Sequence, residues 1–339
     1  SVVKKTPAGR DLVKEYTEAV REAGMKVGIY FSLIDWSDPR YRSVYPEGSD
    51  PKDHLQDVFA TPAGGPEDPE KWQEFLEFNN NQMRELMTNY GTVDLLWFDG
   101  DWERSANQWK AKEFKAYLES LNPNVIVNSR LQGYGDYETP EQGIPLYGPK
   151  GVWEFCTTIN DSWGYRPSDN HYKTSKQIIR MFCDCLTLGG KMLLDVGPKE
   201  DGTLDERQVK VLEDLGTFIH DNEEAIYETE KGLSYSQFLG GSTLSRDKKT
   251  IYLFVYDKPS EYLCVKGVKT PVKKVTVLHT GEELSFDYTG SLPWSGIPGT
   301  LWIKADQMKE HPLTTVLKVE LEGEITYNLG HGEVVTFNN

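Results

Sequence analysis

The chain has 339 residues, of which 38% are hydrophobic and 12% aromatic, and its formal net charge at pH 7 is −16. This composition supplies enough apolar side chains for a large core and excludes a chain that is disordered throughout. The acidic balance argues against nucleic acid as a partner, because phosphate binding needs clustered Lys and Arg. No apolar run reaches membrane-spanning length, so we expect no membrane partner either.

The cysteines do not predict a disulfide scaffold or a metal site. There are four in the whole chain. Cys183 and Cys185 form C-x-C, with no histidine at zinc-ligand spacing, and all four lie in apolar stretches, which favours buried thiols. Glycine-rich motifs that bind nucleotide phosphates do not occur. We expect no cofactor and no metal, and leave open only a calcium ion in the Asp-rich loops at 38–53 or 195–205.

The first part of the chain alternates between helix and strand patterns. Apolar residues at helical spacing predict a helix over 12–23, and the apolar run at 26–33 predicts a buried strand. A loop follows over about 34–67, and loops of this length in compact domains are usually functional or mobile. A second amphipathic helix is expected over about 68–91.

The next strand, Val93 to Asp99, ends in an acidic residue that a glycine follows at once. An apolar run of this length predicts a strand buried on both faces, and in barrel enzymes the loop at its carboxyl end carries the chemistry. Trp97 lies two residues before Asp99 and therefore on the same side of the strand. The pair offers a sugar ring an apolar wall and a reactive oxygen. The alternative is that Asp99 only caps the following turn.

The alternation of helices and strands continues to about residue 222 and predicts a parallel sheet or barrel. Beyond about residue 228, short alternating runs separated by Gly, Pro and Asp predict an antiparallel β-sandwich. We therefore predict two domains, residues 1–228 and 229–339. The other expected elements are helices over 106–121 and 171–188, strands over 124–130, 151–156 and 191–196, a helix opened by a capping box at 203–206, and sandwich strands over 250–256, 272–278, 300–304 and 316–320.

Polar or aromatic side chains end each predicted strand of the first domain, and in a barrel they converge on one mouth. An acidic and aromatic mouth with one arginine suits a neutral polyol, because an anion would need several cations. Glycoside hydrolysis needs a second carboxyl group beside Asp99, and the irregular stretch at 135–141 offers three acids, each of which is by default a solvated loop acid. The strand-end residues are Tyr30, Trp97, Asp99, Asn128, Arg130, Glu154 and Asp195.

Six motifs follow one another in the order GMKVGIYFSLIDWSDPRY, VDLLWFDGDW, VNSR, GDYETPEQ, VWEFCTTINDSWGY and GGKMLLDVGPKEDGT. In this order and spacing they resemble glycoside hydrolase family 29, the retaining α-L-fucosidases. The resemblance covers about residues 8–230, and the C-terminal part is similar in kind but less specific. It implies a (β/α)8-like barrel, incomplete at the N-terminus of this chain, followed by an antiparallel β-sandwich.

The resemblance also assigns catalytic roles. It implies that Asp99 is the nucleophile, because it occupies the acid of the family's W-x-D segment. Glu141 best matches the acid/base, and Glu138 is the runner-up. Asp99 would attack the anomeric carbon of a terminal α-L-fucose while the glutamate protonates the leaving oxygen, with net retention. A retaining mechanism places the two carboxyl groups about 5–5.5 Å apart.

The same resemblance suggests the residues that hold the sugar. Tyr30, Trp97 and Arg130 match residues of the family's fucose site. Trp102 follows the nucleophile and offers a second aromatic wall. Glu154 stands in a similar segment, as does Trp163, and either could equally have a structural role.

The chain departs from the family pattern in one respect. The family carries an earlier portion with a strand ending in His-Trp and a later His-His-Asp-Gly segment, and neither string occurs here. Five strand patterns precede the sandwich, whereas a closed barrel of this type has eight strands. We therefore expect that the N-terminal third of the family fold is absent, cleaved, or carried by another polypeptide that completes the barrel.

Two other functions stay open at this point. One is a non-catalytic carbohydrate-binding protein or a truncated remnant of a fucosidase. The other is a retaining hydrolase of a related sugar such as α-L-galactose. The expected partner is a fucosylated oligosaccharide or glycoconjugate, with a homo-oligomer left open. From what glycan hydrolases do, we expect an extracellular or periplasmic bacterial protein.

Overall fold

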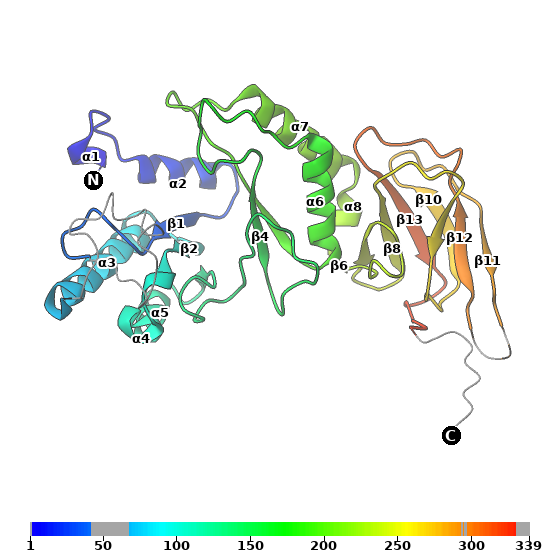
Figure 1. The fold of residues 1–339 in the computed structure, drawn as a ribbon, viewed down its shortest axis with the longest axis horizontal. Coiled ribbons are helices and arrows are strands. Elements are labelled where there is room, and N and C mark those ends of the chain that lie inside the picture. The colour runs from blue at the N-terminus through cyan, green and yellow to red at the C-terminus, as the bar shows by residue number, and fades with distance from the viewer. Residues whose placement is uncertain (1, 42–67, 293, 295–296, 330–339) are drawn as a thin grey trace, which may run out of the picture. The chain divides into compact units, whose positions relative to one another are not determined.

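The computed structural model describes residues 2–41, 68–292, 294 and 297–329 (Figure 1). Most of the loop predicted over 34–67 therefore lies outside the described residues. The chain divides into two compact units, Ser1–Thr139 and Pro140–Asn339. None of the described helices combines the length and apolar character that a membrane span requires.

A three-stranded parallel sheet forms the centre of the first unit, in the order β1-β2-β3. The register places Tyr30 opposite Trp97 and Ser32 opposite Asp99, so the carboxyl ends of β1 and β2 lie at the same edge. β2 is buried as predicted, but β1 is not: Ile29 and Phe31 on one of its faces are half-buried, and Tyr30 on the other face is 58% exposed. The strands are β1 (Gly28–Ser32), β2 (Leu95–Asp99) and β3 (Ile126–Val127).

The helices of the first unit include α1 (Val2–Lys5), α2 (Leu12–Glu22), α3 (Pro69–Asn89), α4 (Ala106–Trp109) and α5 (Ala111–Leu121). The Asp68 side chain caps α3 by accepting from the next backbone N–H groups, which fixes its start. The single helix expected over 106–121 is two helices, because Lys110 adopts a left-handed conformation with φ of 51°. Trp109, just before the break, is buried and donates its indole N–H to the carbonyl of Asp101 at 2.8 Å.

A parallel pair of strands, β4 (Glu154–Thr158) and β5 (Lys191–Asp195), opens the second unit. β4 begins three residues later than the predicted strand over 151–156, so Glu154 starts it instead of ending it. The helices that follow are α6 (Ser175–Thr187), α7 (Glu206–Asp221) and α8 (Glu223–Ile226).

The capping box predicted at 203–206 is wrong, although the helix it was to open is present. The Asp205 side chain caps α7 by accepting from the N–H of Arg207 at 3.0 Å. Thr203 instead donates its hydroxyl to Asp201 at 2.7 Å, in the turn before the helix. A local acceptor therefore outcompetes the helix terminus for this side chain.

Two antiparallel sheets make up the rest of the second unit, in the orders β10-β13-β8-β7-β6 and β11-β12-β9. Side chains from both sheets, including Leu253, Val275 and Ile303, form one apolar core. The four sandwich strands predicted above agree with the observed bounds to within one residue. The strands are β6 (Thr229–Lys231), β7 (Gly241–Ser245), β8 (Thr250–Val255), β9 (Tyr262–Val265), β10 (Val272–Val277), β11 (Phe286–Thr289), β12 (Thr300–Lys304) and β13 (Thr315–Leu321).

The five-stranded sheet is covered on both faces. Side chains alternate along β8, so Leu253 points into the core between the sheets and Phe254 points to the opposite face. Phe254 packs there in one cluster with Ile179 of α6 and Phe218 of α7. The antiparallel part of the unit is thus joined to its helices by a continuous apolar contact.

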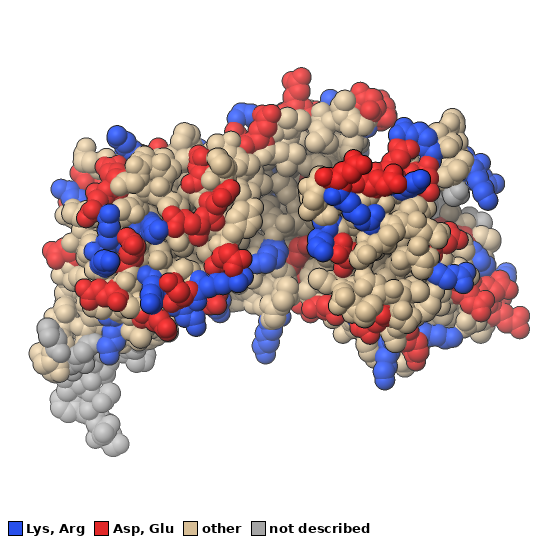
Figure 2. All heavy atoms as spheres, turned by 180° about the vertical axis from the view of Figure 1, so that it is seen from behind, with Lys and Arg blue, Asp and Glu red and all other residues tan. Residues whose placement is uncertain are grey.

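Parallel strands of the described residues form two separate ladders, β1-β2-β3 and β4-β5, and these residues contain no closed barrel. Figure 2 shows Asp and Glu interspersed with Lys and Arg over the face of the molecule seen from behind. This distribution differs from the basic stripe that marks nucleic-acid-binding proteins.

Asp195, at the carboxyl end of β5, carries a testable pH dependence. Burial raises its pKa from 3.8 to about 6, and its Oδ2 atom is buried with no hydrogen-bond partner among the described residues. A carboxyl whose pKa is raised on folding favours the native state below pH 3.8, and this contribution is lost as pH rises to about 6. Asp195→Asn should therefore increase the free energy of unfolding at pH 7 by about 1–2 kcal/mol.

The measurement is urea unfolding of both proteins at pH 7 and pH 4. The difference between variant and wild type should shrink strongly at pH 4, where the native carboxyl is protonated. If Asp195→Asn increased the free energy of unfolding equally at both pH values, the increase would not come from the buried, ionised carboxylate of Asp195.

Candidate active site

The Asp99 carboxylate is held by donors from the two segments that flank β2. Tyr30 lies in the middle of β1, not at its end as the sequence predicted, and Arg130 lies three residues after β3. Its Oδ2 atom accepts a hydrogen bond from the Tyr30 hydroxyl at 2.9 Å, and its Oδ1 atom pairs with Nη1 of Arg130 at 2.6 Å. The side chain of Asp99 is 24% exposed and that of Arg130 18%. The carboxylate is thus fixed in orientation but still reaches solvent.

Trp97 supports this group from one side. The Tyr30 ring stacks on its indole, with ring centroids 5.6 Å apart and an interplanar angle of 23°. The Arg130 guanidinium lies 4.5 Å from the centroid of the same ring. Trp97 is nearly buried, so it forms a platform from which Tyr30 and Arg130 both reach Asp99. The structure therefore brings these four residues together, as the pattern of strand ends predicted.

Asn128 is a candidate positioning residue whose contacts the sequence did not reveal. It is fully buried, and its side chain replaces a rung of the sheet. Its Oδ1 atom accepts from the N–H of Phe98, and its Nδ2 donates to the carbonyl of Phe98, both at 2.9 Å. Gly135 lies so close that an added Cβ would come within 2.0 Å of the Asn128 carbonyl oxygen. Asn128 thus fixes the residue that directly precedes Asp99.

Asp99 borders a cavity of about 430 Å³, a size that suits a small ligand. Trp102, which follows Asp99 on the short turn at Asp101–Glu103, is 61% exposed and forms part of its wall. The cavity is lined by Tyr30, Ser32, Ile34, Asp35, Trp36, Ser37, Asp99 and Trp102. Every one of these residues belongs to the first unit.

The two candidate acids lie in different units. Glu138 is an exposed residue of the first unit, directly after Tyr137, which bridges to Asn128. Glu141 is an exposed residue of the second unit, where its backbone bridges to Cys156 of β4. Backbone hydrogen bonds on either side of Glu141 anchor it to that strand, from Cys156 to Pro140 at 2.9 Å and from Gln142 to Cys156 at 2.8 Å.

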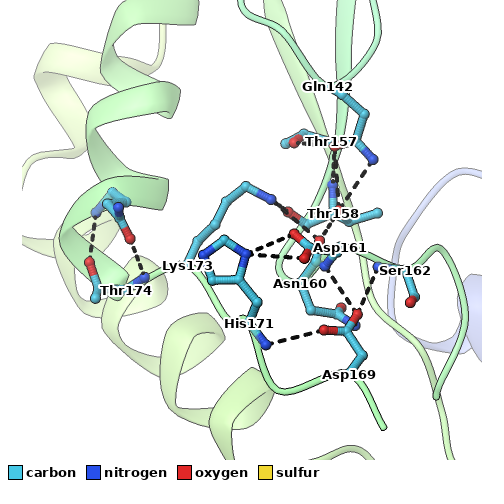
Figure 3. A network of polar contacts seen from close by, with 11 residues as sticks. Gln142, Thr157, Thr158, Asn160, Asp161, Ser162, Asp169, His171, Lys173 and Thr174 are labelled. Atoms are coloured by element: carbon cyan, nitrogen blue, oxygen red, sulfur yellow. Dashed lines mark hydrogen bonds and ion pairs between the residues drawn. The ribbon is translucent and has the colours of Figure 1, made fainter.

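A polar network organises the loop that follows β4 (Figure 3). Asp169 accepts from the Asn160 side chain at 2.7 Å and from the N–H of Ser162 at 2.9 Å. Burial acts to raise the pKa of Asp169, but the hydrogen bonds from Ser162 and Asn160 outweigh it and lower the pKa to about 2. Lys173 donates to the carbonyl of Thr158, the last residue of β4, at 2.8 Å. Trp163 stands in this loop and is 43% exposed.

No group of three or more His, Cys, Asp or Glu side chains in the described residues is arranged to hold a metal ion. Residues 42–53, where a calcium site was left open, lie outside the described part of the chain. Cys156, Cys183 and Cys185 are buried free thiols, and Cys264 is half-buried. Burial raises the pKa of Cys185 to about 12, so it is a poor nucleophile.

Comparison with known proteins identifies the family. Residues 1–224 match the family model described as Alpha-L-fucosidase. The chain belongs to the α-L-fucosidase family. The resemblance first indicated by the six motifs is thereby confirmed, and it includes the segments that carry Asp99 and Glu141.

Individual relatives agree with this assignment. The α-L-fucosidase of Dictyostelium discoideum is 28% identical over 268 residues, which cover 76% of this chain and 54% of the relative. This chain thus spans about half the length of the curated fucosidases that it matches. Among solved structures, α-L-fucosidase isoenzyme 1 from Paenibacillus thiaminolyticus is 31% identical, with a TM-score of 0.78 over 95% of this chain and 79% of that one.

A second solved fucosidase is informative about chemistry. The family 29 α-L-fucosidase from Bacteroides thetaiotaomicron is 27% identical, with a TM-score of 0.77 over 94% of this chain and 73% of that one. That enzyme was trapped as a covalent intermediate in complex with 2-fluoro-fucosyl fluoride. The trapped protein is a variant in which one glutamate is replaced by glutamine.

Proposed function

We propose that this fucosidase-family chain hydrolyses terminal α-L-fucose from glycans with retention of anomeric configuration. The observation that carries the proposal is the Asp99 carboxylate, which Tyr30 and Arg130 orient above Trp97 at the edge of a cavity. A nucleophile needs a fixed direction of attack, and the hydrogen bonds from Tyr30 and Arg130 fix the orientation of the Asp99 carboxylate.

In the proposed reaction, Asp99 attacks the anomeric carbon and forms a fucosyl ester. Glu141 protonates the departing oxygen and then takes a proton from the water that hydrolyses the ester, with Glu138 as the alternative acid. The covalent intermediate trapped in the Bacteroides enzyme with a Glu-to-Gln mutant supports both the ester and a glutamate acid/base. Tyr30, Trp97, Arg130, Trp102 and Glu154 are the proposed sugar contacts.

The proposed architecture follows the same relationship. We propose that the parallel strands β1 to β5, within residues 1–228, are five of the strands of a (β/α)8-like barrel, and that residues 229–339 form a β-sandwich domain. The structural neighbours from Paenibacillus and Bacteroides support this arrangement, since they align over nearly the whole chain. Fucosylated glycans are mainly secreted or displayed on cell surfaces, so we propose an extracellular or periplasmic location.

The experiment that tests the function is hydrolysis of an aryl α-L-fucoside, followed by proton NMR from the first minute. A retaining enzyme releases α-L-fucose first, which then mutarotates to the β anomer. Release of the β anomer first would overturn the double-displacement mechanism, and no release of fucose from folded protein would overturn the hydrolase assignment for this chain.

Asn128 offers a prediction about how the nucleophile is positioned. Asn128→Leu removes both hydrogen bonds to Phe98 and should lower kcat by about 10²-fold, the cost of misplacing a reacting group by roughly 1 Å. Asn128→Asp should behave differently, because a protonated carboxyl can still accept from the N–H and donate to the carbonyl. Its kcat should approach that of the wild type at low pH and fall as the new carboxyl ionises.

The measurement is kcat per folded molecule between pH 4.5 and 8, with the folded fraction taken from near-UV circular dichroism. A purely structural role would reduce the folded fraction and leave kcat per folded molecule unchanged in both variants.

A further inference from the structure

The cavity beside Asp99 extends from the strand ends into the loops that follow. Tyr30 and Asp99 come from β1 and β2, whereas Asp35, Trp36 and Trp102 come from the segments after those strands. Parallel strands direct their carboxyl ends to one side, so the loop residues lie beyond the nucleophile along the strand direction. The cavity therefore has a wall formed by strand residues and a wall formed by loop residues.

Trp36 is held in a fixed orientation within the loop wall. Its indole N–H donates to Oε1 of Glu103 at 3.0 Å, while the Tyr41 hydroxyl donates to Oε2 of the same carboxylate at 2.5 Å. Tyr41 is fully buried, and Arg104 lies 4.3 Å from the centroid of its ring. Burial, together with the hydrogen bond to Glu103, raises the pKa of Tyr41, so it stays a donor. Glu103 thus joins a buried aromatic cluster to a half-exposed indole that borders the cavity.

The lining of the cavity as a whole is acidic and aromatic. Oδ1 of Asp35 accepts from the backbone and hydroxyl of Ser37, and Oδ2 has no hydrogen-bond partner among the described residues. The lining contains two carboxylates, Asp35 and Asp99, and none of its residues is a Lys or Arg. An anionic ligand would be repelled here. A neutral ring with an apolar face and hydroxyl groups would stack on an indole and donate to a carboxylate oxygen.

We propose that Trp36 and Asp35, next to the fucose contact Trp102, form the binding site for the leaving group, and that this leaving group is a neutral pyranose sugar. The proposal rests on the hydrolase function proposed above. In a double displacement the leaving group departs on the side of the anomeric carbon opposite the nucleophile. Asp35, Trp36 and Trp102 follow β1 and β2 in the chain, past the strands that carry Tyr30 and Asp99, and the proposal assigns the leaving sugar to this loop wall. Glu103 is then a positioning residue, because it acts through Trp36.

The test compares two substrates that share fucose and differ in the leaving group. One is α-L-fucosyl fluoride, whose leaving group is too small to contact an indole. The other is a neutral disaccharide in which α-L-fucose is linked to galactose or N-acetylglucosamine. Of these disaccharides, the one that the wild type cleaves fastest is used. Each variant is described by the ratio of kcat/KM for the disaccharide to kcat/KM for the fluoride. Loss of folded protein lowers both values equally, so it cancels from the ratio.

Trp36→Ala should lower this ratio about tenfold, the size expected for loss of an aromatic stacking contact. Trp36→Phe keeps a ring but loses the bond to Glu103, and should lower the ratio about threefold. Glu103→Gln should also lower it, because an amide offers one acceptor and cannot satisfy both Trp36 and Tyr41. Trp294→Ala removes a 76% exposed indole that does not line the cavity, and should leave the ratio unchanged.

An unchanged ratio in Trp36→Ala, with both substrates still cleaved, would overturn the leaving-group site while leaving the hydrolase function intact. A wild-type chain that is folded and cleaves neither substrate would overturn the hydrolase function itself, and the leaving-group site with it.

Discussion

Asp99→Asn is expected to lower kcat for an aryl α-L-fucoside by about 10⁴-fold, the scale seen when a nucleophile is removed from an enzyme that retains its binding site. The amide oxygen is a poor nucleophile and cannot form a stable fucosyl ester. The substitution preserves shape, and Asp99 is partly exposed, so the fold should persist. The measurement is initial rate at saturating substrate, with thermal unfolding of both proteins as the check on folding.

A companion variant distinguishes a lost nucleophile from a damaged site. Asp99→Gly opens space beside the anomeric carbon, and azide added to the assay should attack there. The expected product is β-L-fucosyl azide, with a rate that rises with azide concentration. If azide does not restore activity to Asp99→Gly and Asp99→Asn keeps full turnover, then an acid other than Asp99 is the nucleophile.

The acids nearest in sequence are poor substitutes for Asp99, because each already serves the fold. Asp94 accepts from the backbone N–H of Val27 at 2.9 Å, and Asp101 accepts from that of Gln132 at 2.7 Å. Glu103 has both oxygens occupied by Trp36 and Tyr41. Asp99 instead receives its bonds from two side chains at the edge of a cavity.

The second large effect is expected from the acid/base, and it should depend on the leaving group. Glu141→Gln should lower kcat/KM for a fucosyl disaccharide by about 10³-fold, because an alkoxide leaves slowly without a proton. A dinitrophenyl fucoside, whose leaving group needs no proton, should lose far less in the first chemical step. Glu138→Gln is the matched control and should show no such dependence on the leaving group.

The measurements are pre-steady-state bursts of dinitrophenolate and steady-state rates with the disaccharide. A burst followed by slow turnover in Glu141→Gln would show that ester formation is intact and that hydrolysis of the ester lacks its base. The reverse result, with Glu138→Gln giving the burst, would transfer the acid/base role to Glu138.

The sequence predicted this site where the chemistry follows from strand geometry. Parallel strands end at one edge, so Tyr30, Asp99 and Arg130 could be expected together before their contacts were known. The stack of Tyr30 on Trp97 follows from the register of β1 and β2. These residues are close because neighbouring strands of one parallel sheet carry them, and the pattern of apolar residues in a strand can be recognised from the sequence.

The parts that were missed depend on single tertiary contacts. Asn128 was expected only as a polar residue after a strand, because nothing local shows that its amide pairs with the peptide of Phe98. The contact between Trp36 and Glu103 joins residues 67 positions apart. The break at Lys110 follows no change in apolar periodicity. Such features are set by the partner across space and not by the neighbours along the chain.

The two-sided burial of the five-stranded sheet has a consequence for how the chain can be divided. The expected boundary after residue 228 falls between α8 and β6, but Ile179 and Phe218 before it share an apolar cluster with Phe254 and Val316 after it. A fragment that ends at residue 228 would present those helix side chains to water and should aggregate. Residues 140–339 should accordingly unfold in a single cooperative transition. The parallel strands β4 and β5 would then need the antiparallel strands that follow them in order to stay folded.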